Sequence, residues 1–443
     1  MKRDEIVALD KRYVWHPYTA MESYIAEVNP IVVARAEGPY LWDVEGKRYL
    51  DANGSWWVAT LGHRHPRLVR ALQAQLESFA HAPLAGCTHE PAAALARDLV
   101  DIAPNSEHGI GPESRLTRVF YSDDGSTAVE FAIKAAVQYW AQNGRRERTR
   151  FVSFGGAFHG ETVGATSVGG LDVFRSVFGP VLFDVVHAPA PTDAAECERS
   201  LAFVERALRT DGDAIAAVVI EPVIRGAAGM QMHDPSFVAA LRELTRTHDT
   251  FLIADEVFTG LQRTGATFAC DLAGVVPDFL CLAKALSGGL LPFAATLATE
   301  RVFNGFLGDR ARALYYGHSY CGNPLGAAVA REVLAVHRDD DVAGRVARNA
   351  AVYRERFERM ANTIPGVVRW RARGAVAAID LGGDGYMGGL GWRVFDAARE
   401  RGVYLRPLGD TVYIAPALNI DDRPRDELLD VVEESVRVVM GRV

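Results

Sequence analysis

The 443-residue chain has little of what marks membrane or nucleic-acid-binding proteins. No apolar run is long enough to span a bilayer, and charges scattered through the first residues interrupt any signal-peptide core. The net charge of −8 provides no basic surface for nucleic acid. We therefore expect no membrane partner, no nucleic-acid partner and a cytoplasmic location.

Cysteine is also scarce, at five residues with no CxxC pair: Cys87, Cys197, Cys270, Cys281 and Cys321. An odd and widely spaced set argues against a disulfide framework and against a zinc site. We expect reduced, buried thiols and no metal.

What is present is typical of a globular α/β protein, with 49% hydrophobic and 23% charged residues. Apolar stretches predict strands, and helical spacing predicts helices at 125–140 and 237–248 between them. The predicted strands are 116–122, 150–156, 215–223, 250–257 and 278–284. Near-continuous apolar strands are typical of a mostly parallel sheet that is buried on both faces.

The length exceeds what one hydrophobic core usually serves, so we expect a large domain and a smaller one. After about residue 330 the pattern changes to long amphipathic helices with short strands, which predicts a small α+β domain at 331–443. Residues 61–330 would form the large domain. Residues 1–60, with a hairpin turning at Glu45-Gly46, would pack with the small domain.

Three segments carry candidate chemistry. Gly125 and Ser126 open a predicted helix, where backbone N–H groups and a hydroxyl can bind a phosphate; an ordinary N-cap is the alternative. Asp255 ends an apolar strand, where ligands of α/β sheets gather, although a helix cap or an ion pair would also explain it. Lys284 follows the next apolar strand and could bond covalently to an aldehyde, or be a phosphate-binding or ion-paired lysine.

Together these residues supply the three binding groups that pyridoxal 5′-phosphate needs, one each for its phosphate, its ring nitrogen and its aldehyde. Asp255 would keep the ring nitrogen protonated. Lys284, once released by an incoming amine, would move the proton as general base and acid.

Nearly the whole chain resembles the class III aminotransferases of fold-type I, the pyridoxal-phosphate-dependent transferase fold. The resemblance is carried by "IEPV" at 220–223, "IADEVFTGLQRTG" at 253–265, the Lys284 segment and "GHSYCGNPLGAA" from Gly317. Further stretches resemble the branch that converts 8-amino-7-oxononanoate to 7,8-diaminononanoate in biotin biosynthesis. They are "WHPYTAM" at 15–21, "GSWW" at 54–57 and "YLRPLGDTVYIAPAL" at 404–418.

The resemblance implies a ping-pong aminotransferase with roles for further residues. Phe158 would lie over the cofactor ring, and His318 and Ser319 would contact the phosphate bound by a second subunit. It therefore implies a homodimer with shared active sites. The substrate residues that it implies are Tyr18, Trp56, Trp57, Phe158, Glu161, Gly317 and Arg406.

Aromatic walls with one arginine at the far end suit a long-chain keto acid. Each of these residues also has a structural alternative. The two tryptophans could belong to the core or a dimer interface, Tyr18 could be a surface contact, and Arg406 could pair with Asp410.

Three positions depart from the family pattern. Phe158 stands where tyrosine is usual, Glu161 where aspartate is usual and Arg225 where glutamine is usual. Arg225 could bind a donor carboxylate or, as we expect, pair with a neighbouring acid. Because the first two positions are implicated in recognising adenosylmethionine, the donor could be adenosylmethionine or lysine.

Three other functions fit parts of the pattern. A general ω-amine or diamine:keto-acid aminotransferase would share the cofactor residues, but need not accommodate a long acid. An aminomutase on the same fold would keep Lys284 without releasing a keto product. A catalytically inactive binding protein would have no need of both Asp255 and Lys284.

Overall fold

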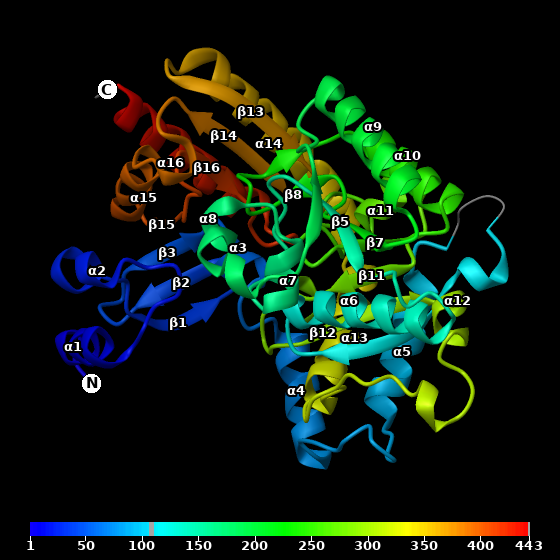
Figure 1. The fold of residues 1–443 in the computed structure, drawn as a ribbon. Helices are drawn as coiled ribbons and strands as arrows, with labels where there is room; N and C mark the ends of the chain where they lie inside the picture. The colour runs from blue at the N-terminus through cyan, green and yellow to red at the C-terminus, as the bar shows by residue number, and fades with distance from the viewer. Residues whose placement is uncertain (106–109, 442–443) are drawn as a thin grey trace.

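The computed structural model describes residues 1–105 and 110–441 and is built around a seven-stranded sheet (Figure 1). The strand order is β4-β12-β11-β10-β7-β5-β6. The bounds are β4 Leu116–Ser122, β5 Arg150–Phe154, β6 Val185–Ala188, β7 Ile215–Ile220, β10 Phe251–Asp255, β11 Phe279–Leu282 and β12 Ala294–Thr299. All neighbouring pairs are parallel except those that β12 makes with β11 and β4. The predicted α/β fold with a mostly parallel sheet is confirmed.

Both faces of this sheet are covered by helices, which explains its apolar strands. Every residue of β7 and β10 is buried. Along β10, Ile253 packs in the cluster under α6 (Gly125–Gln142), whereas Leu252 packs in the cluster under α9 (Ala194–Asp211) and α10 (Pro235–Thr247). Successive side chains of a strand point to opposite faces, so a sheet buried on both sides needs apolar residues throughout.

A second hydrophobic core lies in the C-terminal part of the chain. Its three-stranded sheet has the order β13-β14-β16 and is covered by long helices. The bounds are β13 Val367–Arg373, β14 Val376–Leu381, β15 Val403–Tyr404, β16 Thr411–Ile414, α14 Val342–Thr363, α15 Leu390–Glu400 and α16 Asp422–Met440.

The N-terminal segment is joined to this C-terminal part by a further sheet of order β1-β2-β3-β15. β1 (Val33–Glu37), β2 (Tyr40–Asp43) and β3 (Arg48–Asp51) are antiparallel neighbours, and β3 pairs in parallel with β15. The hairpin predicted around Glu45-Gly46 is therefore present, and a strand from near the C-terminus extends its sheet.

The remaining helices lie around these sheets. α4 and α5 pack against α13, a helix that contains residue 331, where the small domain is predicted to begin. The bounds are α1 Arg3–Tyr13, α2 Met21–Glu27, α3 Gly54–Trp57, α4 Pro66–Ser78, α5 Glu90–Ile102, α7 Val163–Val168, α8 Asp172–Arg175, α11 Ala269–Ala273, α12 Glu300–Asn304 and α13 Pro324–Asp339. A short hairpin pairs β8 (Ile224–Arg225) with β9 (Gln231–Met232). Within the described ranges, no helix combines the length and apolar character needed to cross a membrane.

Cysteine burial differs from the expectation at one position in particular. Cys270 and Cys281 are buried, Cys197 and Cys321 are partly exposed, and Cys87 is exposed because it lies in the open loop before α5.

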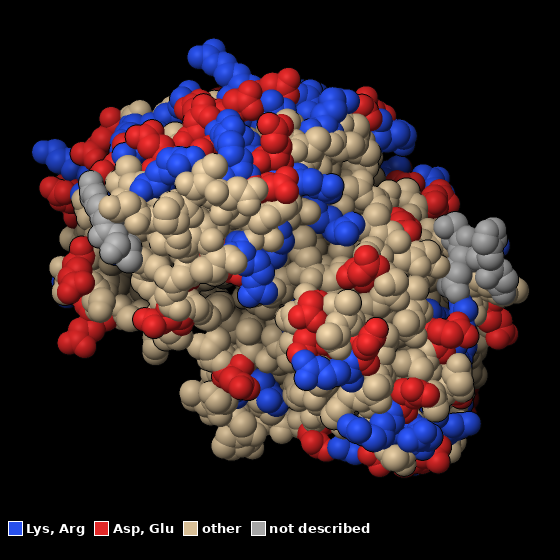
Figure 2. Space-filling view, turned by 90° about the horizontal axis from the view of Figure 1, so that it is seen from above, with Lys and Arg blue, Asp and Glu red and all other residues tan. Residues whose placement is uncertain are grey.

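Residues 1–105 and 110–441 contain no group of His, Cys, Asp and Glu that could hold a metal ion. Acidic and basic side chains are interspersed over the face seen in Figure 2.

Candidate active site

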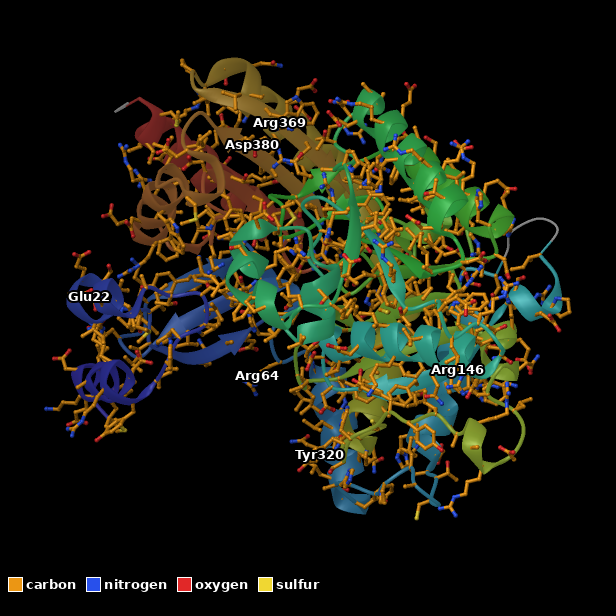
Figure 3. The ribbon with its side chains drawn as sticks, in the orientation of Figure 1. Glu22, Arg64, Arg146, Tyr320, Arg369 and Asp380 are labelled. Atoms are coloured by element: carbon orange, nitrogen blue, oxygen red, sulfur yellow. The ribbon has the colours of Figure 1, made fainter. Side chains whose placement is uncertain are left out.

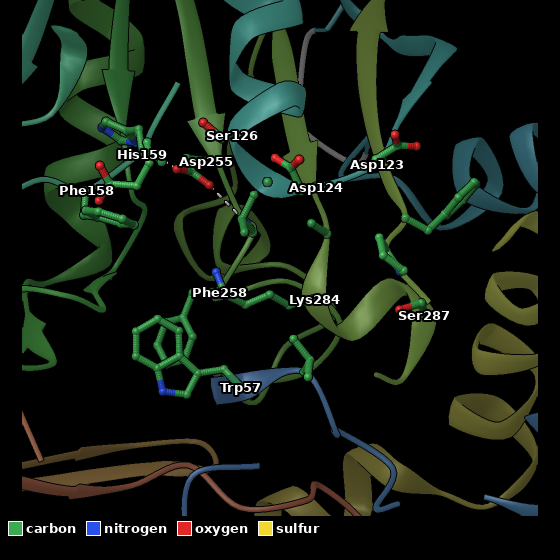
Figure 4. Close-up of a pocket in the computed structure, with 18 of the residues that line it drawn as sticks. Trp57, Asp123, Asp124, Ser126, Phe158, His159, Asp255, Phe258, Lys284 and Ser287 are labelled. Carbon is green, nitrogen blue, oxygen red and sulfur yellow. Dashed lines mark hydrogen bonds and ion pairs between the residues drawn. The ribbon is translucent and has the colours of Figure 1, made fainter. Parts of the chain in front are cut away.

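A cavity of about 790 Å³ opens where several strands of the large sheet end (Figure 4). Asp255 is the last residue of β10, Lys284 follows β11, and Glu221 follows β7 directly. His159 lies in the loop after β5. The carboxyl ends of adjacent parallel strands meet at one edge of the sheet, so the topology brings these side chains together.

Lys284 projects into this cavity from the first position of a short 3-10 turn, with a φ of 40°. A positive φ is strained for a residue with a side chain, and such strain gathers at functional sites. Desolvation lowers the pKa of the Lys284 ammonium, although Asp255, Glu221 and Asp124 oppose that shift. A lowered pKa increases the neutral, nucleophilic fraction of the amine.

The Lys284 nitrogen lies 5.2 Å from the centre of the Trp57 ring. In Figure 4, Lys284 lies between Trp57 and Asp255. Trp57 is buried, and its indole N–H donates a 3.0 Å hydrogen bond to the Tyr413 hydroxyl. The ring of Phe258 packs 4.7 Å from Trp57. This aromatic wall has a fixed orientation on the Lys284 side of the cavity.

Asp255 is held in place from two directions. His159 Nδ1 donates to one carboxylate oxygen at 2.7 Å, and the Val257 backbone N–H donates to the other at 3.0 Å. Burial alone would lower the pKa of His159, but the hydrogen bond and the charge of Asp255 outweigh burial and raise it. These two hydrogen bonds hold the Asp255 carboxylate in the cavity wall, where it can face a positively charged ring nitrogen.

Glu221 is a second buried carboxyl in the cavity wall. Its oxygens accept the backbone N–H groups of Phe158 at 2.9 Å and Gly226 at 3.0 Å. Burial raises the pKa of Glu221 to about 7, with His159 opposing and Asp255 adding to the shift. Through the bond to Phe158, Glu221 fixes the loop that carries the aromatic ring on that side of the cavity.

The start of α6 forms the end of the cavity where an anion can bind. Asp124 caps the helix by accepting the Thr127 N–H at 2.9 Å, so the predicted alternative of an N-cap is also correct. Ser126 Oγ lies 2.8 Å from Thr162 Oγ1. A β-carbon at Gly125 would lie 2.5 Å from Val257 Cγ1, so only glycine fits this close approach without a shift.

At the cavity mouth the Tyr18 hydroxyl donates a 2.6 Å hydrogen bond to Glu161. Burial raises the pKa of the Tyr18 hydroxyl, and Glu161 adds to that shift. Phe174 packs against both Tyr18 and Phe158, at ring-centre distances of 5.5 and 5.4 Å. Tyr18, Phe158 and Glu161, for which the resemblance implies contacts with substrate, line the cavity.

Trp56 and Arg406 form a separate layer outside these lining residues. The Arg406 guanidinium lies 4.6 Å from the Trp56 ring centre, and Trp56 packs edge-on against Tyr18 at 5.7 Å. Arg406 makes no ion pair with Asp410 or any other acid in the described ranges. Its charge is therefore available at the rim.

Gly317, His318 and Ser319 lie in an exposed segment and do not line the cavity. His318 Nδ1 comes within 3.5 Å of Asp123, which does line it. Tyr320, labelled in Figure 3, is 58% exposed on the same segment. Within one chain the cavity therefore lacks the second phosphate contact that the resemblance assigned to this segment.

Arg225 differs from the expectation. Its buried guanidinium donates to the backbone carbonyls of Gly155 at 2.6 Å and Pro191 at 3.2 Å, and it does not line the cavity. The expected ion pair with a neighbouring acid is wrong, because β8 directs this side chain under the loop after β5. The alternative, a contact with a donor carboxylate in this cavity, is not supported by that orientation.

Sequence reasoning missed two groups at the centre of the site. No pattern in the sequence assigns His159 a role in the site, yet it bonds Asp255 directly. Glu221 lies in the stretch "IEPV" at 220–223, which indicates the family but assigns this residue no role. The available signal for both was position, since each follows a buried strand of the same sheet.

Comparison with known proteins agrees with this geometry. Residues 23–436 match the family described as aminotransferase class-III. The chain belongs to this family. It is 39% identical to an adenosylmethionine-8-amino-7-oxononanoate aminotransferase from Geobacter sulfurreducens, over 98% of this chain and 97% of that protein. It is 38% identical to the protein of the same name from Aquifex aeolicus, over 97% and 96%.

Solved structures give the same result. A crystal structure of the Methanocaldococcus jannaschii adenosylmethionine-8-amino-7-oxononanoate aminotransferase has a TM-score of 0.92 and 35% identity, covering 99% of both chains. A PLP-bound amine transaminase from an uncultivated Pseudomonas species has a TM-score of 0.88 and 30% identity, covering 97% of this chain and 98% of that one. The protein is thus a class III aminotransferase of fold-type I, and its cofactor is pyridoxal phosphate.

The residues of the cavity fit this cofactor. A primary amine with a lowered pKa, a buried carboxylate and a glycine-containing helix start lie around one space of adequate size. Their chemistry matches the aldehyde, the ring nitrogen and the phosphate in turn.

Proposed function

We propose that this protein transfers an amino group to 8-amino-7-oxononanoate and so makes 7,8-diaminononanoate, the biotin-pathway reaction. The observation that carries the proposal is the combination of Lys284 and Asp255 in one cavity with the uncompensated Arg406 at its aromatic rim. The names of the relatives that match almost the whole chain support it.

Each residue has a role in this proposal. Lys284 holds the cofactor and moves a proton at the substrate carbon, Asp255 holds the ring nitrogen, and the α6 start with Gly125 and Ser126 binds the phosphate. When bound, pyridoxal phosphate supplies an aldehyde that bonds amines and a protonated ring that withdraws electrons. Phe158 and Trp57 enclose the space from two sides and exclude water.

The keto acid would lie along the aromatic rim. Its apolar chain would contact Tyr18, Trp56 and Trp57, and its carboxylate would reach Arg406, whose planar guanidinium can bind a carboxylate through two hydrogen bonds. Gly317 lies in the exposed segment outside the cavity, where a β-carbon would meet no atom within 4 Å, so in this proposal it would reach substrate in the site of a second copy.

The amino donor in this proposal is adenosylmethionine or lysine, both of which are cations that Glu161 could attract. Purified enzyme mixed with each donor in turn gives the test, because the donor half of the reaction bleaches the cofactor absorbance. We expect bleaching by lysine. Rapid bleaching by adenosylmethionine with none by lysine would show that this protein uses adenosylmethionine, the donor named in its relatives' names.

A second candidate is a general ω-amine transaminase, favoured by the 29% identity and TM-score of 0.92 to an (S)-enantioselective ω-transaminase from Thermomicrobium roseum. The two functions differ in the acid that they need. Activity measured with a panel of keto acids distinguishes them, because the proposed function requires activity with 8-amino-7-oxononanoate. That activity should fall at least about tenfold in Arg406→Gln, because the variant loses one charge-assisted pair with the substrate carboxylate.

We further infer a homodimer with shared sites, a cytoplasmic location and a division into residues 1–60, 61–330 and 331–443. The incomplete phosphate site within one chain supports the dimer, and the exposed His318–Ser319 segment would complete the site of a second copy. The separate hydrophobic cores support the division into large and small domains.

A further inference from the structure

Residues of α9, α10 and β13 line a second cavity, a groove. These three elements are labelled in the upper part of Figure 1. The groove has a volume of about 860 Å³, and it shares no lining residue with the cavity around Lys284. Small-molecule sites usually measure about 300–1,000 Å³. Neither the proposed reaction nor the cofactor uses this space.

The floor of the groove is apolar. Leu201, Met232, Phe237 and Ala240 line it from α9, β9 and α10, and the Trp370 indole lines it from β13. Such a floor suits an aliphatic chain, because contact removes apolar surface from water on both sides.

The two sides of the groove carry opposite charge. Arg354 and Arg373 line the side made by α14 and β13, and neither makes an ion pair within the described ranges. The neighbouring Arg371 differs, because it is neutralised by Asp380 at 2.7 Å. Two charges on this side are therefore uncompensated.

The opposite side carries carboxylates from α9 and the start of α10. They are Asp193, Glu198 and Asp234, and none has an ion-pair partner in the described ranges. Asp193 and Asp234 cap their helices with one oxygen each, which leaves their charge in place. Arg373 helps to lower the pKa of Asp234 from across the groove, after the hydrogen bonds from Ser236, yet the two do not form an ion pair.

His233 adds an unpartnered polar group among the lining residues. The ring is 4% exposed, and its Nε2 accepts the Val223 N–H at 3.0 Å, so the proton of the neutral ring resides on Nδ1. Nδ1 is buried and has no hydrogen-bond partner among the described residues. Burial, with Arg225 and Arg373, lowers the pKa of His233 to about 3, so the ring stays neutral. The neutral ring therefore adds no charge to either side of the groove.

We propose that this groove binds a zwitterionic amphiphile, an amino carboxylic acid with an aliphatic chain. The chain lies on the apolar floor, the carboxylate faces Arg354 and Arg373, and the ammonium faces the carboxylates of α9 and α10. The site is separate from the proposed active site and does not depend on its chemistry.

Calorimetric titration of the holoenzyme with 8-(trimethylammonio)octanoate tests the proposal. A quaternary ammonium cannot exchange its nitrogen, so the measurement is independent of transamination. We expect saturable binding that Arg373→Gln and Asp234→Asn each weaken about fivefold or more. Asp234→Asn keeps the helix cap while removing the charge. Arg373→Lys should restore part of the affinity, and unchanged thermal midpoints would show that the variants are folded.

Two controls locate the site. Arg369→Gln changes an arginine of the same strand that pairs with Asp380 at 3.1 Å outside the cavity (Figure 3), and it should leave binding unchanged. Arg406→Gln should also leave it unchanged. Octanoate and octyltrimethylammonium should each bind more weakly than the zwitterion. No saturable binding, equal affinity for octanoate, or loss of binding in Arg406→Gln instead of Arg373→Gln would each overturn the proposal.

Discussion

Single residues decide the chemistry of this cavity, and Lys284 is the first of them. Its backbone is strained, its amine is desolvated, and its nearest aromatic ring is fixed by a hydrogen bond to Tyr413. The strained backbone and the desolvated amine each cost free energy that a purely structural lysine would not need. At this scale the proposed roles can be tested one side chain at a time.

Lys284→Ala should abolish covalent attachment of the cofactor and lower turnover by at least about 10²-fold, because the variant lacks both the amine and the proton carrier. Borohydride treatment followed by mass spectrometry of peptides measures the attachment. Lys134→Ala, at an exposed position of α6, is the matched control and should behave as wild type. Retained labelling of the Lys284→Ala protein would contradict the assignment.

Glu161 and Tyr18 should act together on the donor. Glu161→Gln removes the charge that would attract a cationic donor, so the donor KM should rise about fivefold or more while the keto-acid KM changes little. Tyr18→Phe removes the 2.6 Å hydrogen bond that orients the carboxylate. The double variant should show less than the sum of the two effects. Strict additivity in steady-state kinetics would show that the hydrogen bond does not matter for recognition.

At the scale of elements, the site depends on how α6 meets the loop after β10. The α6 start and Val257 approach closely at Gly125, and the β-carbon distance of 2.5 Å leaves no space for a methyl group. The neighbouring loop after β5 is equally close, since a β-carbon at Gly160 would lie 2.3 Å from Ser126 Oγ. The geometry of the phosphate site is therefore set by packing between elements.

Gly125→Ala should cost about 1–3 kcal/mol through overpacking and weaken cofactor binding, since the helix start must shift from Val257. Gly179→Ala, where a β-carbon meets nothing within 4 Å, provides the control. Thermal unfolding with and without added cofactor measures both effects. A Gly125→Ala protein with wild-type cofactor affinity would exclude the α6 start as the phosphate site.

The loop after β10 also contains a carboxyl with an unusual titration. Burial raises the pKa of Glu256 to about 7, although backbone N–H groups of Cys270 and Ala269 oppose the shift. The folded protein therefore holds this proton more tightly than the unfolded chain does. Stability from this group is full below the ordinary glutamate pKa and falls as pH rises to about 7.

Glu256→Gln should thus lose less stability than wild type between pH 5 and pH 7, whatever its stability at pH 5, because the variant has no proton to release. Chemical denaturation across this range measures the slope. Glu205→Gln, at an exposed position of α9, should keep the wild-type slope. An unchanged slope in Glu256→Gln would refute the assignment of this titration.

At the scale of the whole molecule, the segment with His318 and Ser319 does not line the cavity of its own chain. This segment is exposed, and aromatic side chains on it, such as Tyr315 at 67%, face solvent in a single chain. A symmetric dimer would place this segment of each chain at the cavity of the other.

Complementation between two impaired variants tests this arrangement. Lys284→Ala lacks the amine, and the double variant His318→Ala with Ser319→Ala lacks the second phosphate contact. If sites are shared, subunit exchange creates one intact site in each mixed dimer, so an equal mixture should recover about a quarter of wild-type activity. Activity at limiting cofactor measures the recovery. An activity no greater than the mean of the separate variants would mean that each chain forms its own site.

The α/β class is predictable from the amino-acid sequence alone, because strands buried on both faces need unbroken apolar residues, and this pattern is visible without coordinates. The sequence also predicts Asp255, Lys284 and the α6 start as candidate site residues, since each lies at the end of a strand or the start of a helix, and the structure brings them to one cavity. Family resemblance added Tyr18, Phe158 and Glu161, which the structure brings to the cavity.

Which residues meet across strands depends on the three-dimensional arrangement of the strands. His159 bonds Asp255 across 96 positions of the chain, and Glu221 binds Phe158 across 63, so no local pattern indicates either contact. The direction of Arg225 was decided in the same way, because the turn into β8 and the position of the loop after β5 set where its guanidinium finds acceptors. Local sequence specifies elements, but parallel strand order sets which of their ends become neighbours.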